Sequence, residues 1–248
     1  YTNSYKIDLM KDSFEKLKKY FKKNNVKKII SFYDQGEVQD DMFSPGYDQS
    51  IEGYKFLIQK LLENEWLGLI IKPKKPGLLK HKLLKITNMI NLGLKTNRLI
   101  LISDSSDKHV KNFDNPPCEF ALAADLAIHD TMVSATAGIE AYLSNTKTIF
   151  FDRFNFFESR FYKNKKNIVY HDWDQLWTDA LSFFDGNNNN FGNWDKAVIN
   201  QIDMFGDNNS DSRIAYITQK VYEYNYKKNN YKLEDIIHDY NRYWNLNE

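Results

Sequence analysis

The sequence predicts a doubly wound, Rossmann-like α/β domain, in which a parallel sheet of about six strands carries helices on both faces. Short apolar runs alternate with amphipathic helical segments from residue 28 to residue 184. The runs are continuously apolar, which indicates strands that are buried on both faces. Five of them lead directly into polar loops. Ligands of such sheets bind outside the carboxyl ends of the strands, so these loops mark the edge at which a site is expected.

Each element follows from its own pattern of apolar and polar residues. Residues 5–25 are predicted to form a basic amphipathic helix, because apolar side chains recur at helical spacing among lysines. The predicted strands span residues 28–33, 67–71, 98–103, 126–128, 148–151 and 168–170. Helices are predicted at residues 48–64, 78–92, 118–124, 137–143, 172–184, 194–205, 213–226 and 233–243. The chain therefore divides into a basic N-terminal helix (1–27), an α/β domain (28–192) and a C-terminal helical segment (193–248).

The composition excludes several classes of protein. The chain has 34 basic and 33 acidic residues, whereas a nucleic-acid-binding domain is usually strongly basic. The single cysteine, Cys118, cannot form an internal disulfide, and it fits a reducing compartment. No apolar run approaches the roughly 20 residues of a membrane span, and the histidines lack metal-ligand spacing. We expect a cytoplasmic, metal-free protein and, because the chain opens on Tyr1, the later part of a longer polypeptide.

A turn of small and hydroxyl-bearing residues precedes the helix that follows the fourth strand. The start of a helix presents unpaired N–H groups and partial positive charge, so it is suited to an anion. Ser134, Ala135 and Thr136 lie at this start, and Gly138 would let a ligand approach the backbone closely. Taken alone, the hydroxyls are better explained as helix caps, but opposite a basic loop they favour a phosphate. Glu140 is suited to ribose hydroxyls, or is an ordinary first-turn acid.

The loop after the second strand supplies that basic group, because Lys72, Pro73 and Lys74 follow one another there. A lysine in this place can aim its ammonium group at a phosphate, although a solvated basic turn explains the same residues. Gly36, in the loop after the first strand, would let the backbone approach a ligand. The chain contains neither G-x-G-x-x-G nor G-x-x-x-x-G-K-[ST], which argues against an NAD site and against a P-loop.

Three further residues at strand ends are candidates for acid–base chemistry, namely Asp34, His129 and Asp130. A histidine at a strand end can act as an acid or base or contact a phosphate, but it is more often structural. The residues alone leave the catalytic group open.

The segments ISFYDQG, LGLIIKPKK and ADLAIHDTMVSATAGIEAYLSNTKTIFFD together resemble the donor-binding half of a GT-B glycosyltransferase. The resemblance covers residues 28–185 and is strongest to bacterial enzymes of capsule and lipopolysaccharide synthesis, including Kdo-transferase-like proteins. It implies that Lys72-Pro73, together with Ser134 and Thr136, grips the phosphate of a cytidine donor, and that Glu140 contacts the donor ribose. Many relatives carry a histidine where this chain has Lys72.

The resemblance implies transfer of a sugar, such as the ulosonic acid of CMP-Kdo, to a bacterial surface glycan or glycolipid, with no metal or other cofactor. A second Rossmann-like domain upstream would bind the acceptor and supply the catalytic base. The lysine-rich face of residues 5–25 would touch the inner face of a membrane or an acidic partner, or is simply solvated. The alternatives are a CDP-glycerol or CDP-ribitol polyol-phosphate transferase and a non-catalytic interaction module that presents its aromatic C-terminal helices to a partner.

Overall fold

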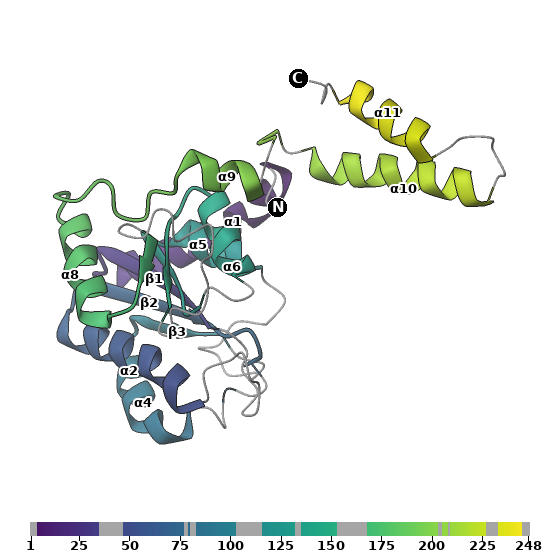
Figure 1. Cartoon of the computed structure of the whole chain (residues 1–248). Helices are drawn as coiled ribbons and strands as arrows, with labels where there is room; N and C mark the ends of the chain where they lie inside the picture. Colours follow the sequence, from purple (N-terminus) through teal and green to yellow (C-terminus); the bar gives the residue numbers. More distant parts are fainter. Residues whose placement is uncertain are drawn as a thin grey trace. The chain divides into compact units, whose positions relative to one another are not determined.

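The structure is a computed structural model, shown in Figure 1. It describes residues 4–34, 47–76, 79, 83–102, 116–131, 135–152, 168–202, 205–207, 209–226 and 233–244. The chain divides into two compact units, residues 2–202 and residues 203–248, and each is described by itself.

The first unit is built on a parallel sheet of six described strands. The strands are β1 (Lys28–Tyr33), β2 (Leu67–Lys72), β3 (Leu99–Leu101), β4 (Leu126–His129), β5 (Lys147–Phe151) and β6 (Val169–Tyr170). Their order across the sheet is β3-β2-β1-β4-β5-β6, and every neighbouring pair is parallel. This order reverses direction between β1 and β4, as in doubly wound nucleotide-binding folds. The predicted fold class is thereby confirmed.

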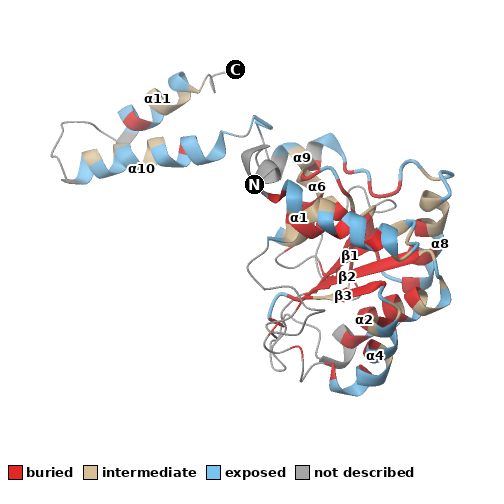
Figure 2. Ribbon diagram, turned by 180° about the vertical axis from the view of Figure 1, so that it is seen from behind, coloured by how far each residue is buried: buried red, intermediate tan, exposed pale blue. Residues whose placement is uncertain are grey.

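Helices cover both faces of this sheet (Figure 1). Their bounds are α1 (Ser4–Lys23), α2 (Tyr47–Glu63), the 3₁₀ helix η2 (Leu84–Ile86), α4 (Thr87–Lys95), α5 (Pro117–Ala123), α6 (Thr136–Leu143), α8 (Trp173–Phe184) and α9 (Lys196–Ile202). Helices α2, α4 and α8 pack on one face, where they share a core cluster with side chains of all six strands. Helices α1 and α5 pack on the opposite face, around Ile70 and Ile100. Red, buried residues accordingly run along the strands and along the helices where these pack on the sheet in Figure 2.

The helix predicted at residues 78–92 was wrong at both ends: within the described residues the 3₁₀ helix η2 occupies 84–86, and α4 begins only at Thr87. Within the described residues, α4 continues through Gly93 to Lys95. A side chain at Gly93 would lie 2.8 Å from Leu99 Cδ2, so the glycine lets α4 approach β3 instead of ending the helix. The turn that follows contains Asn97 with a φ of 57°, a backbone conformation that asparagine tolerates.

Helix α1 belongs to the core of the first unit. Leu17 and Phe21 are buried in the same cluster as Ile70 and Phe120. Gly68 leaves room for the Phe21 ring, because a Cβ there would lie 2.8 Å from it. The apolar stripe of the predicted basic helix is therefore buried against the sheet, and its lysines occupy the opposite side.

The second unit contains α10 (Ser210–Tyr226) and α11 (Leu233–Tyr243). The two helices are joined by aromatic contacts, of which Tyr216 and Tyr243 form a stacked pair with ring centroids 5.2 Å apart. Arg213 is buried, pairs with Asp207 and lies over the Phe205 ring. Among the helices that the structure describes in either unit, none has the length and apolar character needed to cross a membrane.

Candidate functional site

A cavity of about 430 Å³ lies at the carboxyl ends of β1, β2 and β4. Because β1 and β4 are the strands between which the sheet order reverses, this is the place where doubly wound folds bind ligands. We refer to it as the switch-point cavity. Its described lining consists of Tyr33, Asp34, Lys72, Pro73, Lys74, Pro117, His129, Thr136, Ala137 and Glu140.

The cavity collects most of the residues that the sequence singled out. Five predicted donor-binding positions and two acid–base candidates line it, namely Lys72, Pro73, Lys74, Thr136, Glu140, Asp34 and His129. Ala135 and Asp130 are buried, and neither is among the described lining residues. Gly36 and Ser134 lie outside the described residues.

Three lining residues were not predicted: Tyr33, Pro117 and Ala137. Tyr33 is the last residue of β1, and its hydroxyl donates a hydrogen bond to the Pro117 carbonyl at 2.9 Å. The position of Tyr33 at a strand end was a usable signal. Its contact with the start of α5 depends on the folded chain.

Asp34 holds the loop after β2 in place. One carboxylate oxygen accepts a hydrogen bond from the Tyr54 hydroxyl at 2.6 Å, and the other accepts one from the Lys74 backbone N–H at 2.6 Å. Both Asp34 and Tyr54 are buried. The carboxylate thus links α2, the end of β1 and the basic loop, and acts as a positioning group for that loop.

Lys72 ends β2 directly beside Tyr33, with which it is in register. Its side chain is buried, and the ammonium nitrogen lies 5.9 Å from the centre of the Phe120 ring. Burial lowers the pKa of Lys72, while the carboxylates of Glu140, Asp34 and Glu119 oppose that shift. A partly desolvated ammonium group in a cavity wall gains from a further anion, because a nearby negative charge favours the charged form.

The first turn of α6 forms another part of the cavity wall. The N-cap of the helix is Ala135, which has no side-chain acceptor, and Thr136 and Ala137 are the first helical residues. Thr136 is exposed and lines the cavity together with Ala137. Its hydroxyl is therefore not the helix cap. The backbone N–H groups of this turn lie at the positive end of a helix beside the cavity.

Gly138 faces the sheet. A Cβ at this position would lie 2.6 Å from a ring carbon of Phe150 and 3.1 Å from the His129 Cβ. The absence of a side chain therefore lets α6 pack closely on β4 and β5. Gly138 thus makes room for the Phe150 ring, whereas the sequence predicted that it would make room for a ligand.

Glu140 links α6 to α5. Its Oε1 lies 3.4 Å from the Cys118 backbone nitrogen, which donates to it, in the first turn of α5. A carboxylate is stabilised at the start of a helix by the helix dipole. Because Glu140 also lines the cavity, its carboxylate faces both α5 and the space where a ligand would lie.

His129 is a neutral side chain in this site. It is 2% exposed, and its Nδ1 lies 2.8 Å from the Thr131 carbonyl oxygen, so Nδ1 carries the hydrogen and Nε2 is an acceptor. Burial lowers the pKa of His129 to about 4. A group with this pKa is a weak base at neutral pH, so the imidazole is suited to orienting a ligand by hydrogen bonding.

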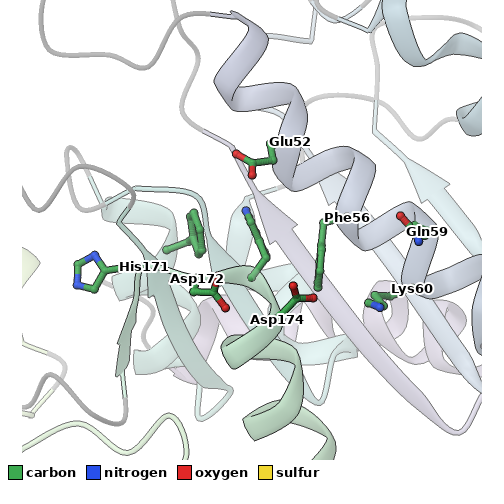
Figure 3. Close-up of a pocket in the computed structure, with 9 residues that line it drawn as sticks. Glu52, Phe56, Gln59, Lys60, His171, Asp172 and Asp174 are labelled. Atoms are coloured by element: carbon green, nitrogen blue, oxygen red, sulfur yellow. The ribbon is translucent and has the colours of Figure 1, made fainter.

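A second cavity, of about 440 Å³, opens beside the carboxyl ends of β5 and β6, and we refer to it as the acidic cavity. In Figure 3, Glu52, Phe56 and Gln59 project from α2, and Asp172 and Asp174 lie at the start of α8. Its floor is aromatic, because the Trp173 ring stacks on those of Phe151 and Phe56 with centroids 4.1 and 5.3 Å away.

The acidic cavity contains none of the residues that the sequence predicted for a site. The Asp172 carboxylate caps α8 by accepting a hydrogen bond from the Gln175 backbone N–H at 2.7 Å. The described residues contain no cluster of three or more acidic, histidine or cysteine side chains that would hold a metal ion, at either cavity or elsewhere. The switch-point cavity is therefore the candidate site.

Neither protein-family models nor curated protein sequences match this chain. The class of protein is consequently defined by the fold, a doubly wound α/β domain with a cavity at its switch point.

Proposed function

We propose that this chain is the donor-binding half of a GT-B glycosyltransferase. It would bind a nucleotide-activated sugar, most suitably a CMP-linked ulosonic acid such as CMP-Kdo, for metal-independent transfer to a bacterial surface glycan. The observation that carries the proposal is the meeting of the Lys72-Pro73 pair, the first turn of α6 and Glu140 around one cavity. The Lys72-Pro73 pair lies more than sixty residues before α6 in the sequence, and α6 supplies both of the other groups.

The chemistry of this arrangement fits a nucleotide phosphate that leaves during transfer. The Lys72 ammonium group and the N–H groups at the start of α6 would stabilise the negative charge on the departing phosphate. Glu140 would accept hydrogen bonds from the ribose hydroxyls. These roles are implied by the resemblance. They are supported by the cavity, because all three groups line it.

Neither Asp34 nor His129, the two acid–base candidates that line the cavity, is suited to activating the acceptor. Both Asp34 oxygens accept hydrogen bonds from protein groups, and the pKa of His129 is lowered to about 4 by burial. Activation of the acceptor would then fall to a second domain, as the resemblance to GT-B enzymes implies.

The direct test measures the melting temperature of the chain with CMP, CDP, UDP and GDP in the presence of EDTA. At about 100 times its Kd, CMP would stabilise the fold by about 2.7 kcal/mol, which corresponds to roughly 5–10 °C. Lys72→Met, which keeps the buried stem and removes the charge, should abolish the shift measured against the unliganded variant. Lys75→Met is the matched control, since Lys75 is an exposed neighbour outside the described lining.

Two outcomes would redirect or end the proposal. Tighter binding of CDP-glycerol than of a CMP-sugar would assign polyol-phosphate transfer to the same cavity. No shift with any of the four nucleotides would exclude a nucleotide site and leave a non-catalytic module of the same fold.

A further inference from the structure

The second half of α1 and the turn after it carry a run of lysines. Between Lys16 and Lys28 the sequence has seven lysines and no acidic residue, although the net charge of the whole chain is only +1. Six of the seven are exposed: Lys16, Lys18, Lys19, Lys22, Lys23 and Lys27. The seventh, Lys28, lies 3.8 Å from the Asp125 carboxylate. We call the six exposed residues the lysine surface.

Five of the six lysines lie on the outer side of α1, whose inner side is already buried, and Lys27 lies between α1 and β1. Leu17 and Phe21 are 2% and 0% exposed, so the apolar stripe of α1 is used in the core. Tyr20 lies among the lysines and is 36% exposed. The surface therefore offers ammonium groups and one amphipathic ring to a partner, without any rearrangement of α1.

The lysine surface lies away from the switch-point cavity. The first half of α1 contacts the start of α5, where Met10 Sδ lies 3.4 Å from Cys118 Sγ and Ser13 hydrogen-bonds Glu119. That start is beside the cavity, since Pro117 lines it. Phe21, in the lysine-rich half, packs instead at Gly68 near the amino end of β2. A partner on the lysine surface would thus leave the cavity open.

We propose that the lysine surface binds the anionic headgroups of a lipid membrane. Clusters of four to eight basic residues on an amphipathic helix attract anionic lipids, and this surface has five on α1 and a sixth just beyond its end. It contains no arginine, the residue that recognises phosphate in fixed bidentate geometry, so it is suited to a diffuse negative surface more than to nucleic-acid recognition. Tyr20 has the amphipathic character of side chains that sit at the headgroup level. The inference does not depend on the proposed transferase function.

The experiment is co-sedimentation of the full chain with lipid vesicles. One set contains phosphatidylcholine alone, and the other contains about 30% phosphatidylglycerol, each at about 0.1 M and about 0.5 M salt. Binding is expected only to the anionic vesicles and should fall steeply at the higher salt. Equal binding to neutral vesicles, or none to anionic ones at the lower salt, overturns the proposal.

Two triple variants locate the binding surface. The test variant carries Lys16→Gln, Lys19→Gln and Lys23→Gln, and the matched control carries Lys55→Gln, Lys95→Gln and Lys196→Gln, all exposed lysines. The test variant should bind anionic vesicles on the order of a hundredfold more weakly, while the control stays within a few-fold of the unmodified chain. An equal loss in both variants would overturn the proposal, because it would reflect net charge alone.

A duplex DNA arm separates the two kinds of polyanion. If the chain binds the duplex more tightly than the anionic vesicles in the same salt, and the test variant loses that binding, the surface belongs to nucleic acid and the lipid proposal is overturned. Vesicle binding should persist in Lys72→Met, so the lipid and nucleotide proposals succeed or fail separately.

Discussion

The switch-point cavity and the acidic cavity have nearly equal volumes, about 430 and 440 Å³, and both open at the carboxyl edge of one sheet. Their walls differ. The first brings a buried ammonium group, a helix start and a neutral histidine around one space. The second has an aromatic floor that is part of the core, and its rim combines carboxylates, one of which caps a helix, with Lys60 and an exposed histidine, His171. Because the two volumes are nearly equal, the buried charge and the position at the switch point are what favour the first cavity as the candidate site.

The largest effect is expected at Trp173, in the floor of the acidic cavity. Trp173 is 5% exposed and stacks on Phe151, so Trp173→Ala should cost about 3–5 kcal/mol of unfolding free energy. Asp174→Asn, at the exposed rim of the same cavity, should cost less than about 1 kcal/mol. Urea unfolding measures both, and the CMP-induced shift should survive in each. A small effect of Trp173→Ala would show that the floor is not a structural core.

His129, in the switch-point cavity, should make the stability of the fold depend on pH. Burial lowers the pKa of His129 to about 4, so the folded chain binds this proton less readily than the unfolded chain, whose histidines titrate near 6.5. The contribution to stability is complete above about pH 6.5 and is lost as pH falls toward 4, by up to about 3 kcal/mol.

His129→Asn should remove this part of the pH dependence. Its amide can still donate to the Thr131 carbonyl, the partner of His129 Nδ1. Carboxylates titrate in both proteins, so the difference between the two stability curves isolates the histidine. Parallel curves between pH 6.5 and 4 would contradict a buried neutral imidazole.

How much the sequence could predict differs between fold and site. Continuous apolar runs such as 67–71 specified the strands, since burial on both faces favours apolar side chains at successive positions. The polar loops after those strands predicted that a site would lie at the carboxyl edge of the sheet. The sequence does not state the order of the strands, so it could not show that Lys72 and Thr136 face one cavity. The bond from Tyr54 to Asp34 was also unpredictable, because it depends on how α2 crosses the sheet.

The hydrogen bond from Tyr54 to Asp34 can be removed to test whether Asp34 supports the basic loop. The test distinguishes a loss of nucleotide binding from a loss of stability alone. Tyr54→Phe removes a hydrogen bond to a carboxylate and should cost about 1.5–3 kcal/mol. It should also weaken CMP binding, since Asp34 holds the Lys74 backbone. Tyr170→Phe is the matched control, because it removes a tyrosine–aspartate bond of 2.9 Å to Asp179, away from this cavity. CMP affinity is measured by calorimetry. Equal affinity in the two variants would contradict the role of Asp34 in positioning the basic loop.

The smallest expected effect on stability is that of a substitution at Gly138, in the helix that forms part of the switch-point cavity wall. Replacement by alanine places a Cβ 2.6 Å from the buried Phe150 ring, and such overpacking costs about 1–3 kcal/mol. The better helix propensity of alanine returns up to about 1 kcal/mol, so a net loss of about 1 kcal/mol is expected. A sequence that shows only a glycine at a helix start cannot distinguish room for a ligand from room for a neighbouring strand.

A double-mutant cycle with Phe150→Leu makes that distinction. If the glycine serves the contact between α6 and β5, the smaller side chain should recover part of the loss, with a coupling of at least about 0.5 kcal/mol in urea unfolding. If it serves the ligand, Gly138→Ala should leave stability nearly unchanged and weaken CMP binding in both backgrounds. The wall geometry predicts the first result, because the space that a side chain would need is already filled by the Phe150 ring.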